Sequence, residues 1–275
     1  MIIAVTLLSE YQYCPRKVYY SRVLKIRVEP TQALVKGKLR HKIEEEISIR
    51  SNFLITTINR GELDFIYELF RKDYLSLVKR TIINNMKLIK NTALDIEKLT
   101  NDFIKTFSDM AKQVSESIHE IILKHKVLGK DILKYIETEQ TAESFIESKE
   151  LQLRGIIDAI EFIDDKVIPV ELKTGSMPKQ GVWPSHKLQV GCYILLCKEK
   201  YEDKKIDYGV VRYLDFGEER EISMNPYLRE EIFAVRDKVI ELLTSGSIPE
   251  RLPAKQGSIN NRCIHCLYKK KCYAD

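Results

Sequence analysis

The sequence predicts an α/β protein in which a mixed β-sheet is flanked by helices. Between Gly61 and Gly129 the chain contains neither glycine nor proline, and its apolar residues recur every three or four positions, which is typical of long helices. From about residue 137 onward, short segments rich in β-branched residues alternate with segments of helical period. This change predicts a helical part followed by a part that contains the sheet.

Each element is expected from its local pattern. Helical period predicts helices over 31–47, over 62–127 (two or three long ones), over 185–200 and over 225–246. Strand-like composition predicts strands over 144–153, 155–163, 166–174 and 207–216. The last helix is expected to begin after Asn225 as its N-cap and to end before Gly246.

Composition describes an ordinary soluble protein. The 275 residues are 44% hydrophobic and 31% charged, which argues against a disordered or fibrous chain. No segment approaches the roughly 18 consecutive apolar residues of a membrane span, and the N-terminus lacks the features of a signal peptide. We therefore expect a cytoplasmic protein with no membrane association, in which the six cysteines are free, metal-bound or catalytic.

Positive charge is concentrated at the two ends of the chain. Residues 14–42 contain nine Lys or Arg against one Glu, and residues 251–275 contain six against one Asp, although the net charge of the whole chain is only +5. Basic ends on an acidic body suit a face that binds a polyanion, with Arg16, Lys17 and the run 269–271 as candidates. Solvated helix surface remains the alternative interpretation.

The segment GIIDAIEFIDDKVIPVELKTG predicts a hairpin that carries two carboxylates. With Asp164 and Asp165 at the centre of the turn, Asp158 lies opposite Glu171, about 5 Å apart at Cβ, and Lys173 shares their face. Two acids and a lysine on apolar strands are costly unless they bind something, and carboxylate oxygens select hard cations such as Mg2+ or Mn2+. A salt bridge at a sheet edge is the alternative.

Three cysteines lie within the last thirteen residues, at C-x2-C-x5-C spacing: Cys263, Cys266 and Cys272. This spacing indicates metal ligands, although a closed thiolate site normally uses four. His265, inside the C-x2-C, is a weak candidate. Cys192 and Cys197 are five apart on a predicted helix and do not share a face, so we expect buried structural thiols there.

These motifs, taken in order, resemble the RecB-like branch of the PD-(D/E)xK nucleases. That branch combines a helical His, a G-x-x-D strand, an E-x-K strand and a helical Q-x-x-x-Y. The matching residues here are His41, Asp158, Glu171, Lys173, Gln189 and Tyr193. The resemblance implies that the sheet and its helices form a nuclease core, interrupted by a long helical insertion.

Within that branch the chain is similar to the CRISPR-associated iron–sulfur exonucleases, the fourth Cas family. Those proteins begin with a Tyr-x-x-Cys-Pro-Arg motif, matched by YQYCPRKVYY, and end with a cysteine trio. The resemblance implies that Cys14 is the fourth ligand of a [4Fe-4S] cluster that joins the two ends of the chain. Zinc would use the same four ligands.

The resemblance also implies four regions and a set of roles. The regions are N-terminal cluster-ligand and histidine helices (1–50), a helical insertion (51–136), the nuclease core (137–246) and a C-terminal cysteine segment (247–275). His41, Asp158, Glu171 and the Leu172 carbonyl would bind Mn2+ or Mg2+, and Lys173 would assist catalysis. Gln189 and Tyr193 would support the site and contact the substrate backbone.

The implied activity is metal-dependent cleavage of single-stranded DNA. We expect a 5′-to-3′ exonuclease, with endonuclease activity left open, that processes CRISPR spacer precursors beside the CRISPR integrase complex. A recombination, repair or viral nuclease with the same chemistry is one alternative. A non-catalytic DNA-binding or assembly subunit is another, against which the complete set of site residues argues. The sequence does not predict the oligomeric state.

Overall fold

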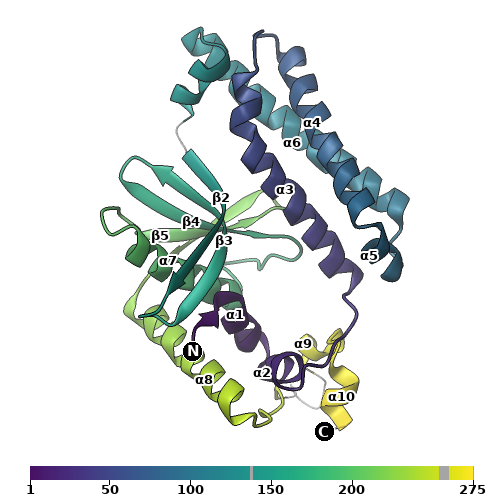
Figure 1. Ribbon diagram of the computed structural model, residues 1–275, viewed down its shortest axis with the longest axis vertical. Helices are drawn as coiled ribbons and strands as arrows, with labels where there is room; N and C mark the ends of the chain where they lie inside the picture. Colours follow the sequence, from purple (N-terminus) through teal and green to yellow (C-terminus); the bar gives the residue numbers. More distant parts are fainter. Residues whose placement is uncertain (137–138, 254–259, 275) are drawn as a thin grey trace. The chain divides into compact units, whose positions relative to one another are not determined.

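The computed structural model describes residues 1–136, 139–253 and 260–274 (Figure 1). The chain forms two compact units. The first comprises residues 1–29 and 143–275, and the second comprises residues 30–142.

A mixed six-stranded sheet organises the first unit, as predicted. The strands follow the order β1-β3-β4-β5-β6, and β2 also pairs with β3. β1 with β3 and β4 with β5 are parallel pairs, whereas β3 with β4 and β5 with β6 are antiparallel. The strands are β1 Ile3–Ala4, β2 Glu139–Ser148, β3 Leu153–Ile163, β4 Lys166–Lys173, β5 Tyr208–Tyr213 and β6 Glu218–Ser223.

β6 is absent from the sequence prediction, which placed a single strand over 207–216. The chain turns after β5 and returns as β6, whose sequence EEREIS buries only Ile222. A charged edge strand with one buried residue carries little apolar periodicity, so sequence patterning does not find it.

Helix α7 (Pro184–Lys200) forms the centre of the first unit's core. Ten consecutive residues, 188–197, are buried, because the helix packs against the sheet, against α1 (Val5–Tyr13) and against α8 (Pro226–Ser245). The prediction that Cys192 and Cys197 are buried is confirmed. Burial raises the pKa of the Cys197 thiol to about 12, which keeps it protonated.

The ends of α8 are confirmed. The Asn225 side chain accepts a hydrogen bond from the Leu228 amide at 2.9 Å, and Gly246 adopts the left-handed conformation at the C-cap. The remaining helices of this unit are short: α2 Pro15–Val18, a π-helical turn Tyr19–Val23, α9 Asn261–Ile264 and α10 Lys269–Ala274.

The second unit is helical and has its own core. Its elements are α3 Gln32–Thr56, α4 Leu63–Asn84, α5 Met86–Asn91, α6 Ile96–His125 and a 3-10 helix Gly129–Tyr135. α4 packs against both α3 and α6, and the four rings Phe70, Tyr74, Phe103 and Phe107 are fully buried. α3 extends beyond the predicted 31–47 and belongs to this unit because its apolar face, including Ile43, joins this core. The predicted insertion, 51–136, lies within the same unit.

No helix in the described ranges is long and apolar enough to span a membrane.

Candidate active site

The β3–β4 hairpin has the register that its turn predicts. Ala159 pairs with Val170 and Ile163 with Lys166, on either side of the turn at 164–165. The paired residues run from Ile163–Lys166 to Ala159–Val170, the position next to Asp158 and Glu171. From Val170 onward β4 is paired on its other side with the parallel strand β5.

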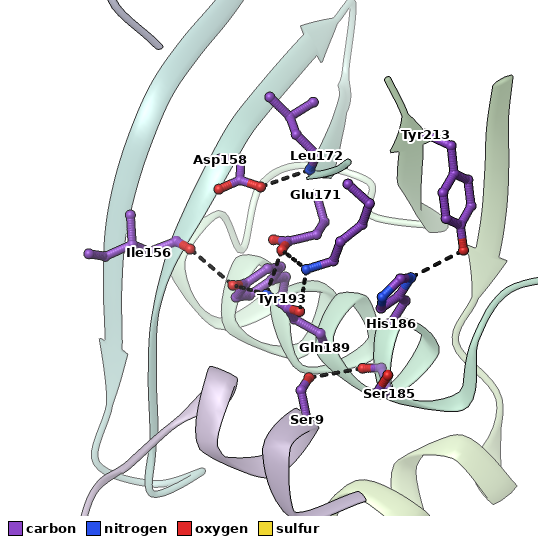
Figure 2. Close-up of polar contacts among 11 residues, drawn as sticks. Ser9, Ile156, Asp158, Glu171, Leu172, Ser185, His186, Gln189, Tyr193 and Tyr213 are labelled. Atoms are coloured by element: carbon purple, nitrogen blue, oxygen red, sulfur yellow. Dashed lines mark hydrogen bonds and ion pairs between the residues drawn. The ribbon is translucent and has the colours of Figure 1, made fainter. Parts of the chain in front are cut away.

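At this end of the hairpin, the side chain of Asp158 connects β3 to β4. Its Oδ2 accepts a hydrogen bond from the Leu172 amide at 2.7 Å, so the carboxylate takes the amide of a strand whose ladder with β3 has ended (Figure 2). Asp158 and Glu171 therefore lie side by side at the point where β3 and β4 separate. This hydrogen bond to the backbone favours one orientation of the Asp158 carboxylate.

Glu171 is buried, with 4% of its surface exposed, and its two carboxylate oxygens differ. Oε1 accepts from Lys173 Nζ at 2.5 Å and from Gln189 Nε2 at 2.7 Å. Oε2 is buried and has no hydrogen-bond partner within the described part of the chain. Because buried carboxylate oxygens are normally satisfied, this oxygen marks a place for an additional positively charged group.

Gln189 connects the hairpin to α7. Its Oε1 accepts from Lys173 Nζ at 3.0 Å, and its Nε2 donates to Glu171 and, at 2.9 Å, to the Tyr193 hydroxyl. The Tyr193 hydroxyl in turn donates to the Ile156 carbonyl at 3.0 Å (Figure 2). Gln189 and Tyr193 are one turn apart, so one face of α7 holds both strands of the hairpin in place.

Gly155 is needed for this contact. A Cβ at residue 155 would lie 2.7 Å from Tyr193 Cε1, which is closer than real atoms approach. The glycine of the G-x-x-D segment therefore lets the Tyr193 ring pass close to β3 and reach the Ile156 carbonyl.

The electrostatics of the site favour a cation. Burial, and secondly the negative charge of Glu171, raise the pKa of Asp158 to about 8. The Leu172 amide and the Lys173 ammonium oppose this shift without cancelling it. With its pKa at about 8, Asp158 is protonated at neutral pH and shares a side-chain hydrogen bond with Glu171. A hard divalent cation held by oxygen ligands would displace that proton and bind both groups as carboxylates.

The predicted ligand His41 lies on α3, in the second unit. Its approach to Asp158 and Glu171 stays a prediction. The residues that the structure describes contain no group of three or more His, Cys, Asp or Glu side chains arranged to hold a metal ion. The hairpin itself contributes two carboxylates.

His186 was missed by sequence reasoning. It lies on α7 one turn before Gln189, and its Nδ1 is 3.1 Å from the Tyr213 hydroxyl. Burial, and secondly the charge of Lys173, lower the pKa of His186 to about 4, so the imidazole is neutral at neutral pH. Its spacing from Gln189 and Tyr193, three and seven residues, is the signal that could have placed it on the site's face of the helix.

Helix α2, near the start of the chain, lies beside α9 and α10 at its end (Figure 1). The Arg16 guanidinium donates to the Pro249 carbonyl at 2.8 Å and to the Cys272 carbonyl at 2.9 Å, and it lies 3.4 Å from Cys272 Sγ. From the other side, Arg262 donates to the Tyr13 carbonyl at 2.9 Å. Arg16 is 8% exposed, so the prediction that it tracks a polyanion is wrong: its charge is used to join the two ends.

Cys14 lies within electrostatic reach of Cys263 and Cys266, and Cys263 lies within reach of Cys266 and Cys272. Burial raises the pKa of Cys14, and the charges of Cys266 and Cys263 add to the shift. Burial likewise raises the pKa of Cys263, with the charges of Cys266 and Cys272 adding to it. The raised pKa values keep Cys14 and Cys263 as neutral thiols, so a metal or cluster bound there would have to displace their protons. No contact to His265 is among those described for this site.

Comparison with known proteins gives three findings. A family model described as "PD-(D/E)XK nuclease superfamily" matches residues 3–273. A curated protein of Arabidopsis thaliana, "DNA replication ATP-dependent helicase/nuclease JHS1", is 24% identical over 279 aligned positions. That match covers 94% of this chain and 19% of the relative, so the chain spans about a fifth of the relative's length.

Among solved structures, "Crystal structure of SSO0001" is 20% identical and aligns with a TM-score of 0.31. The alignment covers 64% of this chain and 79% of that chain.

Proposed function

The chain belongs to the PD-(D/E)XK nuclease superfamily, and on that premise we propose that it is a nuclease that cleaves single-stranded DNA with the help of a divalent cation. The orphaned Oε2 of Glu171 beside the carboxylate of Asp158 is the observation that carries this proposal. Nucleases of this superfamily use divalent cations such as Mg2+ or Mn2+, and these two carboxylates fit one. His41 and the Leu172 carbonyl are proposed as further ligands.

Each residue of the hairpin has a task in hydrolysis. A bound divalent cation supplies an activated water and balances charge on the phosphodiester. The Leu172 amide positions the Asp158 carboxylate, and Gln189 positions the Glu171 carboxylate. Lys173 is held between Glu171 and Gln189, so its ammonium lies next to the reacting phosphate and stabilises the negative charge that develops there. The water oxygen bonds to phosphorus as the phosphorus–oxygen bond of the leaving nucleotide breaks.

The non-catalytic alternative fits the geometry poorly. A subunit that only binds DNA gains nothing from a buried carboxylate oxygen without a partner, which costs roughly 1–3 kcal/mol of stability. A protein that keeps such a destabilising group at one site is expected to need it for function.

For the biological setting we infer a 5′-to-3′ exonuclease that processes CRISPR spacer precursors with the CRISPR integrase complex. The motif around Cys14 and the C-terminal trio support this inference. The similarity to a DNA replication helicase/nuclease supports the alternative, in which the same chemistry serves replication or repair.

The cysteine site is proposed to hold a [4Fe-4S] cluster, with Cys14, Cys263, Cys266 and Cys272 as ligands. The spacing of the cysteines and the contacts between the two chain ends support a metal-containing clamp. Such a clamp closes a loop of roughly 250 residues. Protein purified without oxygen should be brown. Colourless protein that contains stoichiometric zinc would show that the four cysteines bind zinc and not an iron–sulfur cluster.

Cleavage of a linear and of a circular single-stranded DNA tests the proposal. With Mn2+, the wild-type chain should degrade the linear strand from its end and leave the circle, and Asp158→Ala should cleave neither while remaining folded. Asp203→Ala, at an exposed aspartate in the turn before β5, is the matched control and should behave as wild type. Cleavage by Asp158→Ala at the wild-type rate would remove Asp158 from the site, and cleavage of the circle would make the enzyme an endonuclease.

A further inference from the structure

A second feature of the first unit is a cavity of about 900 Å3. Its walls come from the end of α1, the segment after β4, the start of α7 and the C-terminal segment. Among its lining residues are Gln12, Tyr13, Trp183, His186, Asn261 and Arg262. The volume is within the range of roughly 300–1,000 Å3 that is usual for small-molecule sites.

The cavity adjoins the proposed active site. Thr174, which directly follows Lys173, lines it, and so does His186, which lies one turn before Gln189 on α7. His186 is close enough to Lys173 for the lysine charge to affect its titration. A strand whose phosphodiester lies at Glu171 and Lys173 therefore has its neighbouring nucleotide within reach of this cavity.

Among the lining residues that the structure describes, Trp183 offers an aromatic face and Arg262 is the one permanent cation. Trp183 is 40% exposed, and its indole N–H donates to the Ser176 carbonyl at 3.0 Å, which fixes the orientation of the ring. The Arg262 guanidinium lies 5.3 Å from the centre of the Tyr13 ring and donates to the Tyr13 carbonyl. None of the described lining residues is acidic, and His186 is neutral.

This chemistry selects its occupant. An indole face binds a flat ring by stacking, the amide side chain of Asn261 can pair with the edge of a base, and Arg262 attracts a phosphate. Gln12 donates its Nε2 to Glu231 at 3.1 Å, so its Oε1 is the atom that can accept from a base. A paired base offers neither a free face nor a free edge, so only an unpaired nucleotide satisfies all three groups.

We propose that this cavity is a subsite for one unpaired nucleobase of the strand held at the active site, with Trp183 as the stacking surface and Arg262 as the partner of the adjacent phosphate. The inference rests on the proposed function and adds to it: the enzyme recognises a base beside the scissile bond, and this contact selects single-stranded DNA.

The chain contains one tryptophan and 14 tyrosines, so tryptophan emission excited selectively reports on Trp183. The experiment uses the whole protein without added divalent cation, titrated with a hexamer of thymidine nucleotides and with an abasic hexamer of the same backbone. The thymidine hexamer should quench Trp183 emission in a saturable manner, and the abasic hexamer should leave it almost unchanged. Equal changes with both oligonucleotides, or none with either, would overturn the proposal.

Variants separate stacking from folding. Measured with fluorescently labelled hexamers, Trp183→Ala should weaken binding of the thymidine hexamer about tenfold, as expected for the loss of one stacked base, and leave binding of the abasic hexamer unchanged. Trp183→Phe should recover most of the loss. Tyr227→Ala, at an aromatic residue that is 83% exposed on α8, is the control and should bind as wild type. Equal losses for both hexamers in Trp183→Ala would refute stacking.

The outcomes for the subsite and for the nuclease are distinct. Base-dependent quenching without Mn2+-dependent cleavage would leave the subsite standing and remove the nuclease function. Cleavage by a protein that binds both hexamers equally would support the nuclease function and refute the subsite. For an active enzyme, Trp183→Ala should raise KM about tenfold and leave kcat unchanged, because the stacked base binds equally in the ground and transition states.

Discussion

Replacing Gln189 by Ala removes the side chain that connects α7 with both strands of the hairpin. Three hydrogen bonds are lost: two to the charged groups of Glu171 and Lys173, and one to the Tyr193 hydroxyl. Bonds to charged groups contribute about 1.5–3 kcal/mol each and neutral ones about 0.5–1.5 kcal/mol. Because Glu171 keeps Lys173 and Tyr193 keeps the Ile156 carbonyl, we expect the free energy of unfolding to fall by about 3 kcal/mol.

The same substitution should slow cleavage about 100-fold, since misplacing a reacting group by about 1 Å costs that much. Urea denaturation measures the first effect and single-turnover cleavage of single-stranded DNA the second. Gln113→Ala, at an exposed glutamine of α6, is the matched control and should change neither. A Gln189→Ala protein within about 0.5 kcal/mol of wild type, with unchanged cleavage, would refute the idea that α7 positions the carboxylates.

Three further predictions concern Tyr193, His186 and the cysteines. Gly155→Ala should lower the free energy of unfolding by about 1–3 kcal/mol and impair cleavage, because its Cβ would clash with Tyr193; an unchanged melting temperature would contradict this. The lowered pKa of His186 gives stability that is complete above pH 6.5 and lost as the pH falls toward 4. Between pH 7.5 and pH 5, the free energy of unfolding of wild type should therefore fall by about 1 kcal/mol more than that of His186→Gln, a value that allows for solvent screening. Equal losses in the two proteins would count against this role of His186. Finally, Cys14→Ser should abolish the brown colour while Cys197→Ala keeps it, and colour retained in Cys14→Ser would exclude Cys14 as a ligand.

Sequence patterning predicted the parts of the fold that depend on neighbouring residues. The hairpin register follows from a two-residue turn and the period of two, and the ends of α8 follow from Asn225 and Gly246. β6 could not be predicted, because its pairing with β5 is made by the backbone and leaves little trace in side-chain pattern.

The site was predictable in its residue types and less so in its contacts. Asp158 was expected to face Glu171 directly, and the finding that it also accepts the Leu172 amide depends on the separation of β3 and β4. The burial of Arg16 against Cys272 depends on segments 256 residues apart, which no local pattern encodes. The prediction that Cys14 joins the C-terminal trio as a ligand came from the family resemblance, not from spacing.

The rate of Mn2+-dependent cleavage of single-stranded DNA by Lys173→Met, compared with wild type, tests most directly that the hairpin is the catalytic site. Methionine keeps the unbranched side chain and removes the ammonium that Glu171 and Gln189 hold. We predict a loss of about 100- to 1,000-fold in the single-turnover rate, with the fold retained by circular dichroism. A Lys173→Met protein that cleaves at the wild-type rate would contradict the assignment of the site.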